Sequence, residues 1–151
     1  MDQSASKESE IRQGAMELDE AIERQDIDKI ITCFSNDCEI ELLGVKLTGK
    51  AGLRKAVEWM YNHLANIKLT PVVITVEDNI FFEEFLMNSK SSGNTGINVK
   101  LAEVLVYNDD LKVRRLSLYF DRLELAEVFR LNKLDRFIVN RIKRESLKGL
   151  L

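Results

Sequence analysis

The sequence predicts an α+β domain in which three helices precede a meander of four antiparallel strands, with one more helix at the end. Two patterns indicate this order. Apolar residues recur every three or four positions through most of residues 11–66, whereas residues 67–121 alternate between apolar and polar side chains. With 151 residues, of which 45% are hydrophobic and 31% charged, the chain is long enough to form one domain with its own core.

Two helices and a strand are predicted in the N-terminal part. Residues 1–10 are polar, and we expect them to be disordered before a first helix over residues 11–24. Asp26 is a suitable N-cap for a short second helix. Residues 38–43 then alternate between apolar and polar, which is typical of a half-buried strand. The inward-facing residues of this strand are Cys38, Ile40 and Leu42.

A longer third helix is predicted over residues 50–66, after a turn at Thr48 and Gly49. Trp59 and His63 share one of its faces, beside its apolar stripe. Segments rich in Asn, Asp, Ser and Gly separate the four strands that follow. These strands are predicted over residues 67–77, 80–88, 97–107 and 111–121.

Charge is unevenly distributed along the chain, although the net charge is only −3. From Arg130 onward, seven basic and two acidic residues give +5, whereas 15 basic and 23 acidic residues give −8 over residues 1–129. The basic part falls on an amphipathic helix predicted from Leu123 to about Leu147. We expect this helix to pack on its own domain or on a second subunit, with a membrane surface or a protein partner as the alternative. Nucleic-acid binding is not expected, because the acidic body would repel phosphates.

The sequence lacks the motifs of a secretory signal, a metal site and a cofactor site. The first residues lack the apolar stretch of a secretory signal, so we expect a cytoplasmic protein. Cys33 and Cys38 have no second cysteine pair and the chain has one histidine, so no metal site is expected. Neither a glycine-rich phosphate loop nor a Ser-His-Asp arrangement occurs in the sequence, and we expect no cofactor.

Four short segments carry a resemblance to a known family, namely Ala21–Asp28, Cys33–Ile40, Thr48–Leu53 and Leu118–Asp121. In this order and spacing they resemble the nuclear-transport-factor-2-like superfamily over residues 11–127. This superfamily includes ketosteroid isomerase, the SnoaL-like polyketide cyclases and limonene epoxide hydrolase. The resemblance implies a cone-shaped, curved antiparallel sheet wrapped around the three helices, with an apolar pocket inside, and pairing into a homodimer. The remaining residues 128–151 would then form a basic helical extension.

The resemblance also places apolar residues where these relatives have catalytic ones. The proton-abstracting Asp of ketosteroid isomerases matches Leu42, and an Asp on the last strand of the epoxide hydrolases matches Leu118. Their Arg and second Asp match Phe85 and Met87, so neither mechanism is expected. We therefore predict a pocket that binds a small hydrophobic molecule without a recognised catalytic set. Its predicted lining is Leu42, Trp59, Phe81, Phe85, Met87, Leu116, Leu118 and Phe120.

Glu83 offers an alternative, an isomerase, cyclase or dehydratase. If Phe81 and Phe85 face the pocket, alternation places Glu83 between them, where burial would raise its pKa and suit it to act as an acid or a base. With the opposite register Glu83 faces solvent, and the pattern does not decide. His63 is either its catalytic partner across the pocket or a residue at a helix end.

A third hypothesis is a non-enzymatic, dimeric interaction module whose interior is filled by side chains. On the predicted outer face of the sheet, Glu103 with Arg115 and Tyr119 would form a polar cluster across neighbouring strands. Such a cluster would support a dimer interface rather than chemistry.

Overall fold

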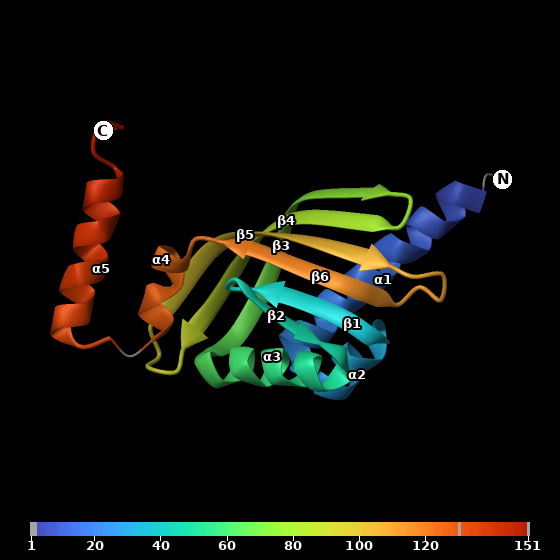
Figure 1. Cartoon of the computed structure of the whole chain (residues 1–151), viewed down its shortest axis with the longest axis horizontal. Coiled ribbons are helices and arrows are strands. Elements are labelled where there is room, and N and C mark those ends of the chain that lie inside the picture. The colour runs from blue at the N-terminus through green and yellow to red at the C-terminus, as the bar shows by residue number, and fades with distance from the viewer. Residues whose placement is uncertain (1–2, 130, 151) are drawn as a thin grey trace.

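The computed structural model of this chain describes residues 3–129 and 131–150. One six-stranded sheet, with strand order β2-β1-β6-β5-β4-β3, curves over helices that pack against it (Figure 1). The sheet is open, because the edge strands β2 and β3 do not pair with each other in the described part of the chain. The predicted α+β class is confirmed, without closure of the sheet into a barrel.

The N-terminal elements are α1 (Gln3–Arg24), α2 (Ile27–Cys33), β1 (Phe34–Leu42), β2 (Val45–Thr48) and α3 (Gly49–His63). Asp26 caps α2 as predicted, because its carboxylate accepts a hydrogen bond of 3.0 Å from the backbone N–H of Lys29. Residues 3–10, predicted to be disordered, are helical and belong to α1. A helix already formed over residues 11–24 extends easily into neighbouring residues. Residues 1–2 lie outside the described residues.

Strand β2 is an element that the sequence pattern did not indicate. Its four residues lie between Gly44 and Gly49, both of which have a positive φ. The sequence pattern therefore indicated a turn over this segment. The four residues pair with β1 in antiparallel fashion, with Glu39 opposite Thr48. A strand this short, with most of its side chains exposed, leaves little periodicity to detect.

The four predicted strands of the meander are present as β3 (Leu64–Glu77), β4 (Ile80–Ser91), β5 (Gly96–Tyr107) and β6 (Val113–Phe120). Each pairs antiparallel with the next. β6 also pairs with β1, and this pair is parallel, with Ile40 opposite Leu116. The sheet is therefore mixed rather than wholly antiparallel, because the chain crosses from β1 to the far strands through α3.

Alternate residues of β4 and β5 face the helices. Phe81, Glu83 and Phe85 are all buried on this inner face of β4, whereas Phe82 between them is exposed. The register that places Glu83 toward the interior is thus the one the chain adopts. On β5 the buried set includes Glu103, which lies directly opposite Glu83.

The C-terminal part contains three helical pieces instead of one continuous helix. They are α4 (Arg122–Leu125), the short 3-10 helix η1 (Ala126–Val128) and α5 (Lys133–Ser146). The backbone leaves the helical conformation at Phe129, and Asn132 caps the new helix by accepting a hydrogen bond from the N–H of Asp135. Arg130 of the predicted helix lies outside the described residues.

The two ends of this C-terminal part differ in burial. Leu125 and Val128 are buried against the domain, whereas the apolar side chains of α5 are not. Figure 1 shows α5, in red, at the end of the molecule and apart from the sheet. Among the described residues, no helix has the length and apolar character needed to cross a membrane.

Candidate functional site

A cavity of about 370 Å³ lies between the inner face of the sheet, α1, α3 and the α4–η1 segment. Its lining is almost wholly apolar, and the ionisable side chains in it are Asp19, Glu103 and Arg122. Cavities of this size and character accommodate small organic molecules, with the few polar groups fixing the orientation of the ligand.

Seven of the eight predicted pocket residues line this cavity. They are Leu42, Trp59, Phe85, Met87, Leu116, Leu118 and Phe120. The eighth, Phe81, is packed instead within the main core, where it is 1% exposed. The three apolar residues of β6 in this set face the cavity because they alternate with outward-facing residues such as Tyr119.

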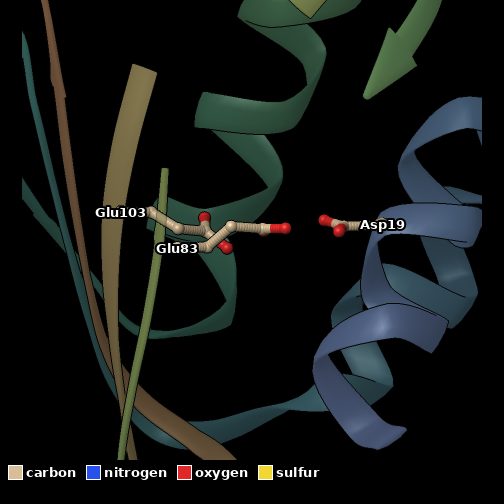
Figure 2. A group of neighbouring side chains, drawn as sticks. All are labelled: Asp19, Glu83 and Glu103. Carbon is tan, nitrogen blue, oxygen red and sulfur yellow. The ribbon is translucent and has the colours of Figure 1, made fainter. Parts of the chain in front are cut away.

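Three carboxyl groups meet at one wall of the cavity. Glu83 and Glu103 project from neighbouring strands toward α1, which supplies Asp19 (Figure 2). One carboxylate oxygen from each lies within 4.8 Å of the other two. We call this group the acid cluster. Asp19 and Glu103 reach the cavity surface, and Glu83 is 1% exposed.

The acid cluster has no cationic partner among the described residues. No hydrogen bond or ion pair within them reaches the side chains of Asp19, Glu83 or Glu103. Oε1 of Glu83 is fully buried without a hydrogen-bond partner. Such isolation is unusual, because buried polar groups in folded proteins are nearly always hydrogen-bonded and buried charges are normally paired.

Burial and mutual repulsion both favour the protonated form of these acids. Burial, followed by the charges of Glu83 and Glu23, raises the pKa of Asp19 to about 7. Burial alone raises the pKa of Glu83. Burial, with the charges of Asp19 and Glu83, holds the pKa of Glu103 well above its ordinary range. The cluster therefore keeps its protons to a higher pH than ordinary carboxyl groups do.

Tyr107 lies near this cluster on the same strand as Glu103. Burial, followed by the charge of Glu103, raises the pKa of Tyr107 above its ordinary value. Its hydroxyl is buried without a hydrogen-bond partner among the described residues. It adds a second neutral, unpaired polar group to this part of the interior.

The structure does not bring His63 together with Glu83. His63 is the last residue of α3, and its Nδ1 lies 2.8 Å from the carbonyl oxygen of Trp59. Its ring packs between Trp59 and Phe129, with ring centroids 4.9 and 5.4 Å away. Trp59 and Phe129 line the cavity and His63 does not, so the histidine contacts two lining residues without reaching the cavity itself.

Glu103 was predicted on the outer face of the sheet, and this prediction was wrong. It is 7% exposed and faces Asp19, whereas Arg115 and Tyr119 are exposed on the other face. Alternation could not decide this, because both faces of the strand are apolar around Glu103, with Leu101 and Leu105 on one face and Val104 on the other.

Asp19 was not recognised as a site residue from the sequence. It lies on α1 between Leu18 and Ile22, both of which line the cavity. An acid within the apolar stripe of a helix is a detectable signal, and it becomes informative once Glu83 and Glu103 are known to lie opposite.

The family model of the SnoaL-like domain matches residues 16–115, which include Asp19, Glu83 and Glu103. The chain belongs to the SnoaL-like domain family. This confirms the resemblance drawn from the four sequence segments. No curated protein sequence matches this SnoaL-like chain closely enough to count as a relative.

Solved structures share the fold of this SnoaL-like chain at low sequence identity. A nuclear-transport-factor-2-like protein from Burkholderia pseudomallei has a TM-score of 0.74 at 15% identity, covering 81% of this chain and 98% of its own. A protein described as a polyketide cyclase from Xanthomonas campestris pv. campestris has a TM-score of 0.73 at 17% identity, with coverage of 81% and 98%. An epoxide hydrolase from M. tuberculosis gives 0.68 at 13% identity, with coverage of 81% and 90%. At these identities the likeness concerns the fold alone.

Proposed function

We propose that this SnoaL-like domain binds a small, largely apolar molecule in the cavity, with the acid cluster as the polar anchor for that molecule. The observation that carries the proposal is the position of Asp19 and Glu103 on the wall of a cavity of about 370 Å³ whose other lining residues, apart from Arg122, are apolar. Apolar walls supply affinity through burial, and a few polar groups supply orientation. The apolar residues Leu42, Phe85, Met87 and Leu118 extend these walls, at positions where the family resemblance implies catalytic groups in relatives.

The test is to fill the cavity and measure binding of a fluorescent naphthalene probe. Leu118→Trp places a larger ring inside, because Leu118 lines the cavity. Tyr119→Trp is the matched control, since this neighbouring side chain is 59% exposed on the other face. We expect probe fluorescence to rise with the native protein and with Tyr119→Trp, but not with Leu118→Trp. Equal probe binding by all three proteins would contradict the proposal.

A second candidate function is acid–base catalysis on the bound molecule, as in an isomerase, cyclase or dehydratase. The raised pKa values of Asp19, Glu83 and Glu103 favour it, because a carboxyl that keeps its proton to a higher pH is better able to donate it to a substrate. Polyketide cyclases and epoxide hydrolases are among the proteins of similar fold. The test is turnover of an epoxide or an unsaturated ketone. Glu83→Gln should abolish that turnover, and an unchanged rate would remove Glu83 from the reaction.

A homodimer is the assembly that we propose. The apolar face of α5 is exposed, with Leu134 at 66% and Phe137 at 59%. Its basic charge complements the acidic residues 1–129, so the body of a second copy is a suitable partner. We also propose a cytoplasmic location, where Cys33 and Cys38, which are not bridged, would stay reduced.

A further inference from the structure

The acid cluster and the cavity beside it together specify a ligand more closely than either does alone. Three carboxyl groups converge where no cation of the described chain reaches them, and the side chain of Glu83 points toward Asp19 (Figure 2). Glu83 is 1% exposed, and its Oε1 has no hydrogen-bond partner among the described residues. An unpaired buried acceptor of this kind is costly to keep in a folded protein. The acid cluster therefore lacks a hydrogen-bond donor or a positive charge, and a ligand can supply either one.

We infer that the cavity takes an organic amine, whose ammonium group is held by Asp19, Glu83 and Glu103 and whose hydrocarbon part fills the apolar walls. The inference rests on the proposed function and names the class of molecule that the cavity binds. It assigns the acid cluster a role in recognition. The three carboxylates accept hydrogen bonds, and the apolar residues around them exclude water from those bonds.

The three carboxylates lie close enough together for one ammonium group to reach all of them. Three N–H donors that leave one nitrogen in tetrahedral directions, with hydrogen bonds of about 2.8 Å, reach acceptors about 4.6 Å apart. The three oxygens lie within 4.8 Å of one another. A bound Mg²⁺ or Ca²⁺ would need further oxygen ligands or water in addition to these three carboxylates.

The surroundings of the cluster also favour an organic cation over a metal ion. Apart from Asp19 and Glu103, the lining near the cluster offers apolar side chains such as Leu18, Ile30 and Leu101. A hydrated metal ion gains nothing from such walls. An amine with a hydrocarbon body gains from both parts of the site, because it pairs its charge and buries its apolar surface.

Binding of an amine is expected to release protons. Among the described residues, the further ionisable groups coupled to the cluster are Glu23 on α1 and Tyr107 on β5, and neither supplies a positive charge. An incoming ammonium group would therefore lower the raised pKa values of Asp19, Glu83 and Glu103 and displace protons from them. A neutral ligand of the same shape would displace none.

The test compares phenylpropylamine with phenylpropanol by titration calorimetry near neutral pH, in two buffers with different ionisation enthalpies. The two molecules match in shape and differ in charge. We expect the amine to bind at least about tenfold more tightly, a difference of about 1.4 kcal/mol. Its binding should also release protons, whereas that of the alcohol should not.

Glu83→Gln and Glu103→Gln should each remove the preference for the amine and reduce the proton release. Glu84→Gln is the matched control on the same strand, because Glu84 faces outward and pairs with Lys100 at 3.1 Å. This control should keep the full preference. Melting temperatures of the three variants show whether each remains folded, and binding of the naphthalene probe shows whether the cavity remains open.

The other outcomes overturn the inference in distinguishable ways. If the naphthalene probe binds but the amine is not favoured over the alcohol, recognition of an amine is wrong while the proposed binding function stands. If neither the probe nor the two phenylpropyl compounds bind, the proposed function fails and the inference fails with it. Titration with MgCl₂, CaCl₂ or MnCl₂ alone tests the metal site. Tight metal binding that Glu83→Gln abolishes would replace the amine by a metal ion.

Discussion

Glu83 is a residue whose burial is expected to lower the stability of the fold. Its carboxyl group is buried between Phe81 and Phe85 on the inner face of β4, with one oxygen unpaired. An apolar residue at this position would remove the desolvation cost. Residues that lower stability without a structural benefit are typical of functional sites, which is why Glu83 is central to both candidate functions.

Replacement of Glu83 tests directly how much free energy the burial of its carboxyl group costs. We predict that Glu83→Met raises the free energy of unfolding by about 1 kcal/mol or more near neutral pH, because it removes an unsatisfied buried group at similar volume. Glu84→Met, on the outward face, should change stability by less than about 0.5 kcal/mol. Chemical denaturation measures both variants. A loss of stability in Glu83→Met would mean that the carboxyl makes favourable contacts in the folded protein.

Asp19 makes stability depend on pH in a definite direction. Its pKa is raised from 3.8 to about 7 in the folded chain, so the folded state holds a proton that the unfolded state has already lost. Between these two values the free energy of unfolding should therefore fall as the pH rises, by at most about 1.4 kcal/mol per pH unit. Below this window Asp19 is protonated in both states, and above it the penalty stays constant.

The Asp19→Asn variant isolates this contribution. We predict that it loses stability less steeply than the native protein as the pH rises from 3.8 to about 7, because the asparagine does not titrate. Glu83 and Glu103 also have raised pKa values and keep some slope in the variant. Urea denaturation at several pH values measures the difference. Parallel curves for the two proteins would show that Asp19 titrates normally.

At the scale of elements, the junction of α2, β1 and α3 depends on one lysine. The ammonium group of Lys50, in the first turn of α3, donates hydrogen bonds to the carbonyl oxygens of Ile31 and Phe34. These carbonyls lie where α2 ends and β1 begins, and that of Ile31 also accepts a hydrogen bond from the backbone N–H of Phe34. Lys50 therefore fixes the corner from which β1 enters the sheet.

We predict that Lys50→Met lowers the free energy of unfolding by about 1–3 kcal/mol, because it keeps the aliphatic stem and removes a charged donor from part-buried acceptors. Lys55→Met, at an exposed position of the same helix, is the matched control and should have little effect. Thermal unfolding followed by circular dichroism measures both. Equal melting temperatures for the two variants would contradict the role of Lys50.

Periodicity predicted the elements well where a pattern was long. The four strands of the meander and the helices α2 and α3 follow from spacing alone, as does the inner face of β6. The acid cluster did not follow, although Glu83 was a candidate. Its members come from α1, β4 and β5, and only the packing of α1 across the sheet brings Asp19 to the two glutamates.

At the scale of the whole molecule, the first piece of the C-terminal part packs against the domain and the second piece, α5, does not. Leu125 and Val128 belong to a buried cluster of the domain, and Phe129 contacts the ring of Trp59 at a centroid distance of 6.4 Å. Beyond this point α5 exposes Leu134, Phe137 and Ile142. An amphipathic helix with an open apolar face needs a partner to be stable, and the chain itself offers an acidic surface of opposite charge.

We predict that truncation after Phe129 weakens dimerisation while the body stays folded, because the buried residues Leu125 and Val128 are kept. Light scattering after size-exclusion chromatography compares the molar masses of the full and truncated chains over a range of concentrations. Ile138→Lys in the full chain should have the same effect, since Ile138 is 46% exposed and its loss costs the monomer little.

Salt identifies the kind of contact that holds the two copies together. Attraction between the basic α5 and the acidic body should weaken as salt screens it, whereas an apolar contact alone should not. The dimer is therefore expected to dissociate more readily at high ionic strength. A full chain that is monomeric in solution, or a truncated chain that remains dimeric, would contradict this role of α5. Binding of the full chain, but not the truncated one, to anionic vesicles would assign the helix to a membrane surface instead.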